Sequence, residues 1–179
     1  MIEVKPFILR IVSIFLLIAV CFLLQTSVFI HFELASVGPN LLIALTSLFG
    51  FMRGQKEGAI IGFSCGLLND LFFGSYFGAF ALIYMLIGYL NGFFRKLLYG
   101  DDIKLPLLLV SISDIIYGFA VFVFMFLSRS KTNLGFYVGS VILPEMVYTL
   151  IVSFLLYFVV FKLNQWLEKK EKRSDRLVR

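Results

Sequence analysis

Three acidic side chains stand in stretches that are otherwise apolar enough to lie in lipid. Asp70 follows a row of glycines in GFSCGLLNDLFFGSYFG, Asp114 lies within LLLVSISDIIYGFAVF, and Glu145 follows a proline. A carboxylate at the centre of a bilayer costs about 3 kcal/mol, so such acids usually carry protons or make polar contacts between helices. These acids are therefore the first candidates for function.

The depth of each acid in the membrane bears on its expected role. Asp70 lies twelve residues beyond Gly58, roughly 18 Å along a helix and toward the outer leaflet, with Asn69, Glu145 or an outer-loop backbone N–H as expected partners. Glu145 suits the first turn of the last span, where an acid faces the positive helix end. Asp114 is nearer the midplane without a Lys or Arg at its depth. We expect it to be protonated or hydrogen-bonded, by Ser111, Ser113 or Tyr117.

Composition predicts an all-α, polytopic membrane protein that positions these acids. The chain is 60% hydrophobic and 15% charged, with a mean hydropathy of +0.97. A helix needs about 20 apolar residues to cross the hydrocarbon core. Six such helices in one compact bundle are predicted, at residues 7–30, 38–52, 57–73, 76–94, 104–127 and 141–162, within a transmembrane domain of residues 1–163.

Positive charge predicts the orientation, because Lys and Arg favour cytoplasmic loops. Fourteen of the sixteen Lys and Arg fall on one side of the predicted spans, and only Arg129 and Lys131 fall on the other. Both termini should therefore be cytoplasmic. The net charge of +5 follows from this topology and does not indicate nucleic-acid binding.

Residues 164–179 form a basic cytoplasmic tail in this prediction. An interfacial tryptophan and a cluster of basic residues favour contact with anionic lipid, and the tail is expected to continue the last helix. The tail residues concerned are Trp166, Lys169, Lys170, Lys172 and Arg173.

Glycines recur at four-residue spacing around Asp70. Residues four apart share a helix face, so the row makes a groove that another backbone can approach closely. This pattern predicts packing within a helical hairpin or docking of a partner helix, by Gly58, Gly62, Gly66, Asp70, Gly74, Gly78, Gly88 and Gly92.

Signals for enzymatic chemistry are poor. The only histidine, His31, has no partner at metal-ligand spacing, and the two cysteines, Cys21 and Cys65, lie in separate spans without a CxxC motif. Phosphate loops and GxSxG or HExxH motifs do not occur in the sequence. We therefore expect a non-enzyme without catalytic residues, metal or cofactor.

The segment from Pro39 to Phe94 resembles the family of rod shape-determining proteins MreD. The similarity rests on a proline and a polar residue opening a span, an Arg-Gly turn, a G-F-x-x-G-L-x-x-D stretch, a glycine turn and an A-L-x-Y-x-x-x-G-Y-x-x-G helix. These features fall on Pro39, Asn40, Arg53, Gly54, Gly62, Phe63, Gly66, Leu67, Asp70, Gly74, Gly78, Ala81, Leu82, Tyr84, Gly88, Tyr89 and Gly92. Asn40 departs from the family, which often has Asp there.

The resemblance implies a non-enzymatic inner-membrane subunit of the bacterial cell-elongation machinery, which builds peptidoglycan in rod-shaped cells. Its implied partner is the bitopic scaffold MreC and, through MreC, the MreB filament, the glycosyltransferase RodA and the elongation transpeptidase. In that setting the glycine groove would receive a single-pass partner helix.

Two other classes of protein remain open. The S component of an energy-coupling-factor vitamin transporter has a similar size, six helices and similar glycine spacing. Such subunits typically carry Ala-x-x-x-Ala in the first helix, whereas here Ala19 is followed four residues later by Leu23. A proton-coupled carrier would use the buried acids, but carriers usually contain broken helices, and these spans read as continuous.

Overall fold

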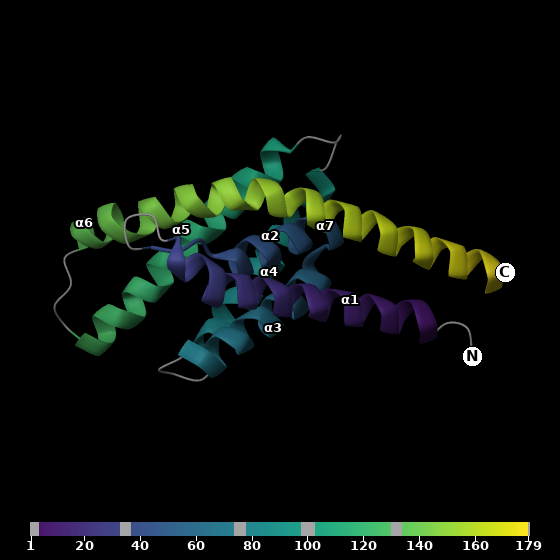
Figure 1. The fold of residues 1–179 in the computed structure, drawn as a ribbon, viewed down its shortest axis with the longest axis horizontal. Helices are drawn as coiled ribbons and strands as arrows, with labels where there is room; N and C mark the ends of the chain where they lie inside the picture. Colours follow the sequence, from purple (N-terminus) through teal and green to yellow (C-terminus); the bar gives the residue numbers. More distant parts are fainter. Residues whose placement is uncertain (1–3, 33–36, 74–77, 98–102, 130–133, 179) are drawn as a thin grey trace.

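The regular elements of the chain are helices throughout the part that the structure describes. The computed structural model describes residues 4–32, 37–73, 78–97, 103–129 and 134–178. The main helices are α1 (Val4–Leu23), α2 (Leu41–Arg53), α3 (Gln55–Phe73), α4 (Ala79–Phe93), α5 (Lys104–Arg129), α6 (Leu134–Tyr137) and α7 (Leu143–Val178) (Figure 1). Short π or 3-10 segments occupy Leu24–Val28, Phe29–His31, Phe94–Leu97 and Val138–Ile142. The all-α prediction is confirmed.

Helix α2 forms the centre of the bundle. All thirteen of its residues are buried, and it contacts α1, α3, α4, α5 and α7. The sequence LLIALTSLFGFMR explains this position, because a helix that is apolar on all sides has no face for water and is buried. Around α2, neighbouring contacts run from α3 to α4, from α4 to α5, from α5 to α7 and from α7 to α1.

Three of the described helical stretches are long and apolar enough to cross a membrane. They are Ile8–Val28, Lys104–Phe124 and Leu134–Lys170. Helices α2 and α4 are also apolar but have 13 and 15 residues, which at 1.5 Å per residue is short of the roughly 30 Å hydrocarbon core. Each of the six predicted positions holds a helix, but six complete spans remain a prediction.

The last helix is longer than the predicted span 141–162. Helix α7 continues without a break through the predicted tail to Val178, and Leu167 and Asn164 are buried against the bundle. The C-terminal end of α7 and the N-terminal end of α1 point toward the same end of the molecule (Figure 1).

Candidate functional site

The glycine row of α3 faces α4 inside the chain. An added Cβ on Gly62 would collide with the backbone carbonyl of Tyr84, and one on Gly66 would lie 2.5 Å from the Phe80 carbonyl oxygen. Gly58 meets the backbone of Gly88 in the same way. The contacts are those of helix packing, and docking of a partner helix on this face would require α4 to leave.

The remaining glycines of the row fall into separate groups. Gly92 of α4 approaches the backbone at Gln55, which extends the close contact to the start of α3. Gly78 is the N-cap of α4 with φ +95°, so a left-handed conformation explains glycine there. Gly74 lies outside the described residues.

Asp70 receives the first free N–H groups of α4. Its Oδ1 accepts a hydrogen bond from the Phe80 N–H at 3.0 Å, and its Oδ2 accepts one from the Ala81 N–H at 2.8 Å. The first N–H groups of a helix have no partner within that helix and carry positive partial charge. The sequence led us to expect an outer-loop backbone N–H, Asn69 or Glu145; the donors are backbone N–H groups, but they belong to the first turn of α4.

Asn40 connects three helices at the start of α2. Its Oδ1 accepts hydrogen bonds from the Ile43 N–H at 3.2 Å and from the Tyr84 hydroxyl at 3.1 Å. Its backbone N–H donates to Thr149 Oγ1 at 3.0 Å, and its Nδ2 lies 3.4 Å from Glu145 Oε1. Asn40 thereby caps α2 and fixes it to α4 and α7.

A cleft opens beside Asn40, where α2 and α4 begin and α3 ends. We call it the polar cleft; its volume is about 420 Å³, and its lining includes Gln25, Gly38, Asn40, Asn69, Tyr117 and Glu145. Gln25 Oε1 accepts the Leu42 N–H at 3.2 Å, and Asn69 Nδ2 lies 3.5 Å from the Tyr117 hydroxyl. In the predicted orientation this cleft faces the outside of the cell.

Asp114 is buried, with 3% of its surface exposed, and the hydroxyl that interacts with its carboxyl group is that of Thr149 in α7. The three hydroxyls expected to serve it make other contacts. Ser111 donates to the Leu107 carbonyl and Ser113 to the Leu109 carbonyl, while the Tyr117 hydroxyl faces Asn69. The prediction of these partners is wrong, because Ser and Thr in buried helices bond readily to the carbonyl four residues back.

The basic end of α7 carries the remaining predicted residues. Trp166 is 43% exposed, and Lys170 Nζ lies 5.6 Å from the centre of its ring, in cation–π range. Lys169 is exposed, and Lys172 and Arg173 lie further along the same helix. An exposed ring beside cations suits the headgroup layer of a membrane.

Sequence reasoning did not single out a charged cluster near the starts of α1 and α3, at the end of the bundle opposite the polar cleft. Glu57 lies 3.5 Å from Arg10 and 3.9 Å from Arg53, and Arg95 Nη1 donates to the Arg53 carbonyl at 2.7 Å. The spacing of Arg53 and Glu57, four residues apart, was the available signal. Arg10 and Glu57 are far apart in the sequence, so no sequence pattern indicated that they would meet.

The histidine and the two cysteines of the sequence lie in separate places in the described structure. No group of three or more His, Cys, Asp or Glu there could hold a metal ion, and Cys21 and Cys65 are separate, buried thiols. His31 Nδ1 lies 3.0 Å from the Ser27 carbonyl oxygen within its own helical segment.

A buried central helix, flanking helices long enough to cross a bilayer and a polar recess at one end define an α-helical membrane protein. Over residues 5–167, the chain matches the family of rod shape-determining protein MreD, and it belongs to that family. No curated protein and no solved structure matches it. The resemblance seen in the sequence is confirmed, and the chain is a bacterial membrane protein that determines rod shape.

Proposed function

We propose that this chain is a non-enzymatic subunit of the cell-elongation complex that binds an MreC-like bitopic scaffold through its helix bundle, with both termini in the cytoplasm. The family match carries the proposal, since the MreD family belongs to the rod-shape system. Through the scaffold, the subunit would act with MreB, RodA and the elongation transpeptidase on peptidoglycan synthesis.

The polar cleft is the proposed contact for the scaffold's segment just outside the membrane. A bitopic partner leaves the bilayer beside the bundle. The polar cleft lies at the predicted outer end of the bundle, and its lining offers both hydrogen-bond donors and acceptors. Its amide and hydroxyl groups are held by hydrogen bonds to α2 and α5, so they are already in place before a partner arrives. Such preorganisation lowers the entropic cost of binding.

Gly38 allows the cleft to be blocked without disturbing the packing. It lines the cleft, and a Cβ at this position meets no described atom within 4 Å. Gly38→Phe should reduce co-purification of the co-expressed scaffold at least tenfold in mild detergent. Gly139→Phe is the matched control, because Gly139 also has open space at its Cβ and does not line the cleft.

The proposal fails if Gly38→Phe and the wild-type chain retain the scaffold equally, or if the wild-type chain retains none. Thermal unfolding of both variants should match the wild type, which separates blocked binding from misfolding.

The volume of the polar cleft favours one second candidate, a substrate-binding S component of a vitamin transporter. A recess of about 420 Å³ falls within the size range of small-ligand pockets. Native mass spectrometry of the purified chain distinguishes the two functions. A stoichiometric small molecule that Gly38→Phe displaces would support the S component.

A further inference from the structure

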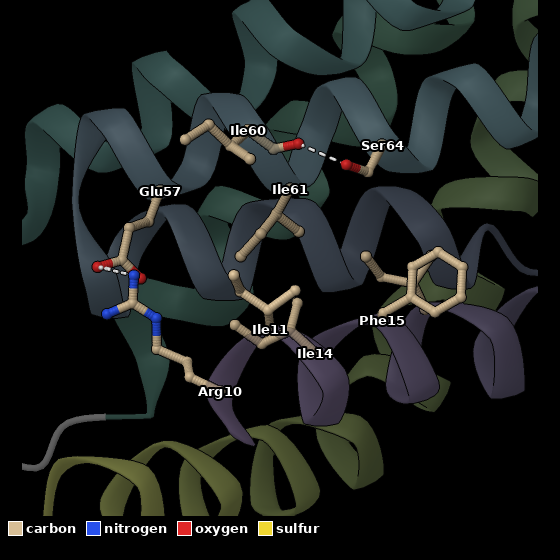
Figure 2. A pocket seen from close by; sticks show the side chains of 9 residues that line it. Arg10, Ile11, Ile14, Phe15, Glu57, Ile60, Ile61 and Ser64 are labelled. Carbon is tan, nitrogen blue, oxygen red and sulfur yellow. Dashed lines mark hydrogen bonds and ion pairs between the residues drawn. The ribbon is translucent and has the colours of Figure 1, made fainter. Parts of the chain in front are cut away.

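A second groove runs between α1 and α3 on the surface of the bundle. Its volume is about 240 Å³, and apolar side chains line its length, among them Ile14, Ile18 and Ile61. Figure 2 shows Ile11 and Ile14 of α1 near Ile61 of α3, and Arg10 joined to Glu57 at one end. We call this groove the α1/α3 groove.

The packing of the bundle explains why the groove exists. Helix α1 packs on α2 and α7, whereas α3 packs on α2 and α4, so both helices lie against the same central helix and have other main partners than each other. At the far end their aromatic side chains meet, with the ring centres of Phe22 and Phe72 4.9 Å apart. The groove is bounded at one end by the charges of Arg10 and Glu57, and the ring contact lies beyond its other end.

The position of the groove matches one leaflet of a membrane. Arg10 and Glu57 lie at the end that the charge distribution places in the cytoplasm. Ser64 follows seven residues after Glu57, which is roughly 10 Å further along α3. The groove thus extends from the inner headgroup layer into the hydrocarbon core.

The charged end presents both signs at close range. Arg10 Nη2 lies 3.5 Å from Glu57 Oε1, and the two side chains are 23% and 27% exposed. A headgroup that carries a phosphate and a primary ammonium can meet the guanidinium with one charge and the carboxylate with the other. A phosphatidylglycerol headgroup lacks the ammonium, and a choline group has no N–H to donate to Glu57.

We propose that the α1/α3 groove binds an inner-leaflet phosphatidylethanolamine, with an acyl chain between the isoleucines, the phosphate at Arg10 and the ammonium at Glu57. A partner helix fits this groove poorly. Close helix approach in membranes uses small residues, whereas this lining is mostly isoleucine and phenylalanine with a single serine. The proposal does not depend on scaffold binding.

Native mass spectrometry of the full chain in mild detergent tests the proposal. The probes are phosphatidylethanolamine, phosphatidylglycerol and phosphatidylcholine with identical acyl chains. We expect at least fivefold greater retention of the ethanolamine lipid. Ser64→Phe should abolish that excess by filling the groove, and Gly139→Phe should leave it unchanged, since its Cβ points into open space.

Glu57→Gln tests the headgroup contact separately from the acyl chain. This variant should lose the preference for ethanolamine over choline while still retaining lipid. Equal retention of the three lipids by the wild-type chain, or an unchanged preference in Glu57→Gln, would overturn the proposal.

A photoreactive side chain at Ile60, which is 66% exposed beside the groove, identifies the occupant in cells that also express the scaffold. We expect an adduct with the mass of the ethanolamine lipid. An adduct to the scaffold would instead assign the groove to a protein helix.

Discussion

Asp70 is stabilised by backbone N–H groups, which explains how an acid is accommodated next to a row of glycines. Asp70→Ala would leave the N–H groups of Phe80 and Ala81 without their acceptors in a buried site. The expected cost is about 2 kcal/mol in the free energy of unfolding. Reversible unfolding in mixed micelles measures it, and Asp70→Asn, which keeps one acceptor oxygen, should fall between the alanine variant and the wild type.

Asn40 makes a second prediction at the scale of single residues. Asn40→Asp keeps the acceptor that caps α2 but places a carboxylate where Nδ2 now lies 3.4 Å from Glu145. Two carboxyl groups at that distance either repel each other or must share a proton, and losing the Asn40 donor should destabilise the fold by about 2 kcal/mol at neutral pH. Adding Glu145→Gln restores a donor and should recover most of the loss, and a double-mutant cycle by unfolding in micelles measures the coupling. Additive effects would contradict the contact.

The partner of a side chain could be predicted only where the two groups are close in the sequence. A backbone N–H as the partner of Asp70 was foreseeable, because the hairpin returns α4 past the end of α3. The position of Asn40 next to Thr149 was not, because it depends on how α7 is rotated about its axis. That rotation is set by packing over many apolar side chains, and the sequence pattern does not specify it.

The close packing of α3 on α4 depends on the glycines at their contact, which have no side chain to keep the two backbones apart. Gly62→Leu would drive its side chain into the Tyr84 carbonyl and the Thr46 methyl group, the latter 3.0 Å from the new Cβ. Because the obstacle is backbone, we expect a loss of about 3 kcal/mol or more. Gly139→Leu, whose Cβ meets no described atom within 4 Å, should change stability little. Thermal unfolding of the two variants in the same detergent makes the comparison, and equal stability would refute close packing.

Helix positions were largely predictable, and so was the continuation of the last helix into the tail, whereas the short length of α2 was not. Apolar runs between loops gave all six predicted locations, because composition alone marks what can leave water. Helix α2 has only 13 residues, and α7, which has 36 residues, includes most of the polar tail. Good helix formers such as Lys, Glu and Gln let α7 continue after its apolar stretch ends. The prediction that the tail continues the last helix is confirmed, although hydropathy alone does not show it.

At the scale of the whole molecule, α2 is the axis and the other long helices surround it. Neighbouring contacts connect α3, α4, α5, α7 and α1 in that order, and the interface between α1 and α3 contains the groove. The sequence predicted a bundle but gave no indication of which helix would be central. A short apolar helix reads like any other span until its neighbours are known.

The two ends of α5 allow the orientation of the whole bundle to be tested. Lys104 begins α5, and Leu134, which follows its end, begins α6; both residues are exposed. Helix α5 has 26 residues, about 39 Å, enough to cross the bilayer. Cysteine at position 134 should therefore react with a membrane-impermeant maleimide in intact cells, and cysteine at position 104 only after permeabilisation.

Cys21 and Cys65 are buried, so the parent chain provides an unlabelled control. Reaction of both positions from the same side would disprove the predicted topology, and with it the placement of the polar cleft outside the cell and of the α1/α3 groove in the inner leaflet.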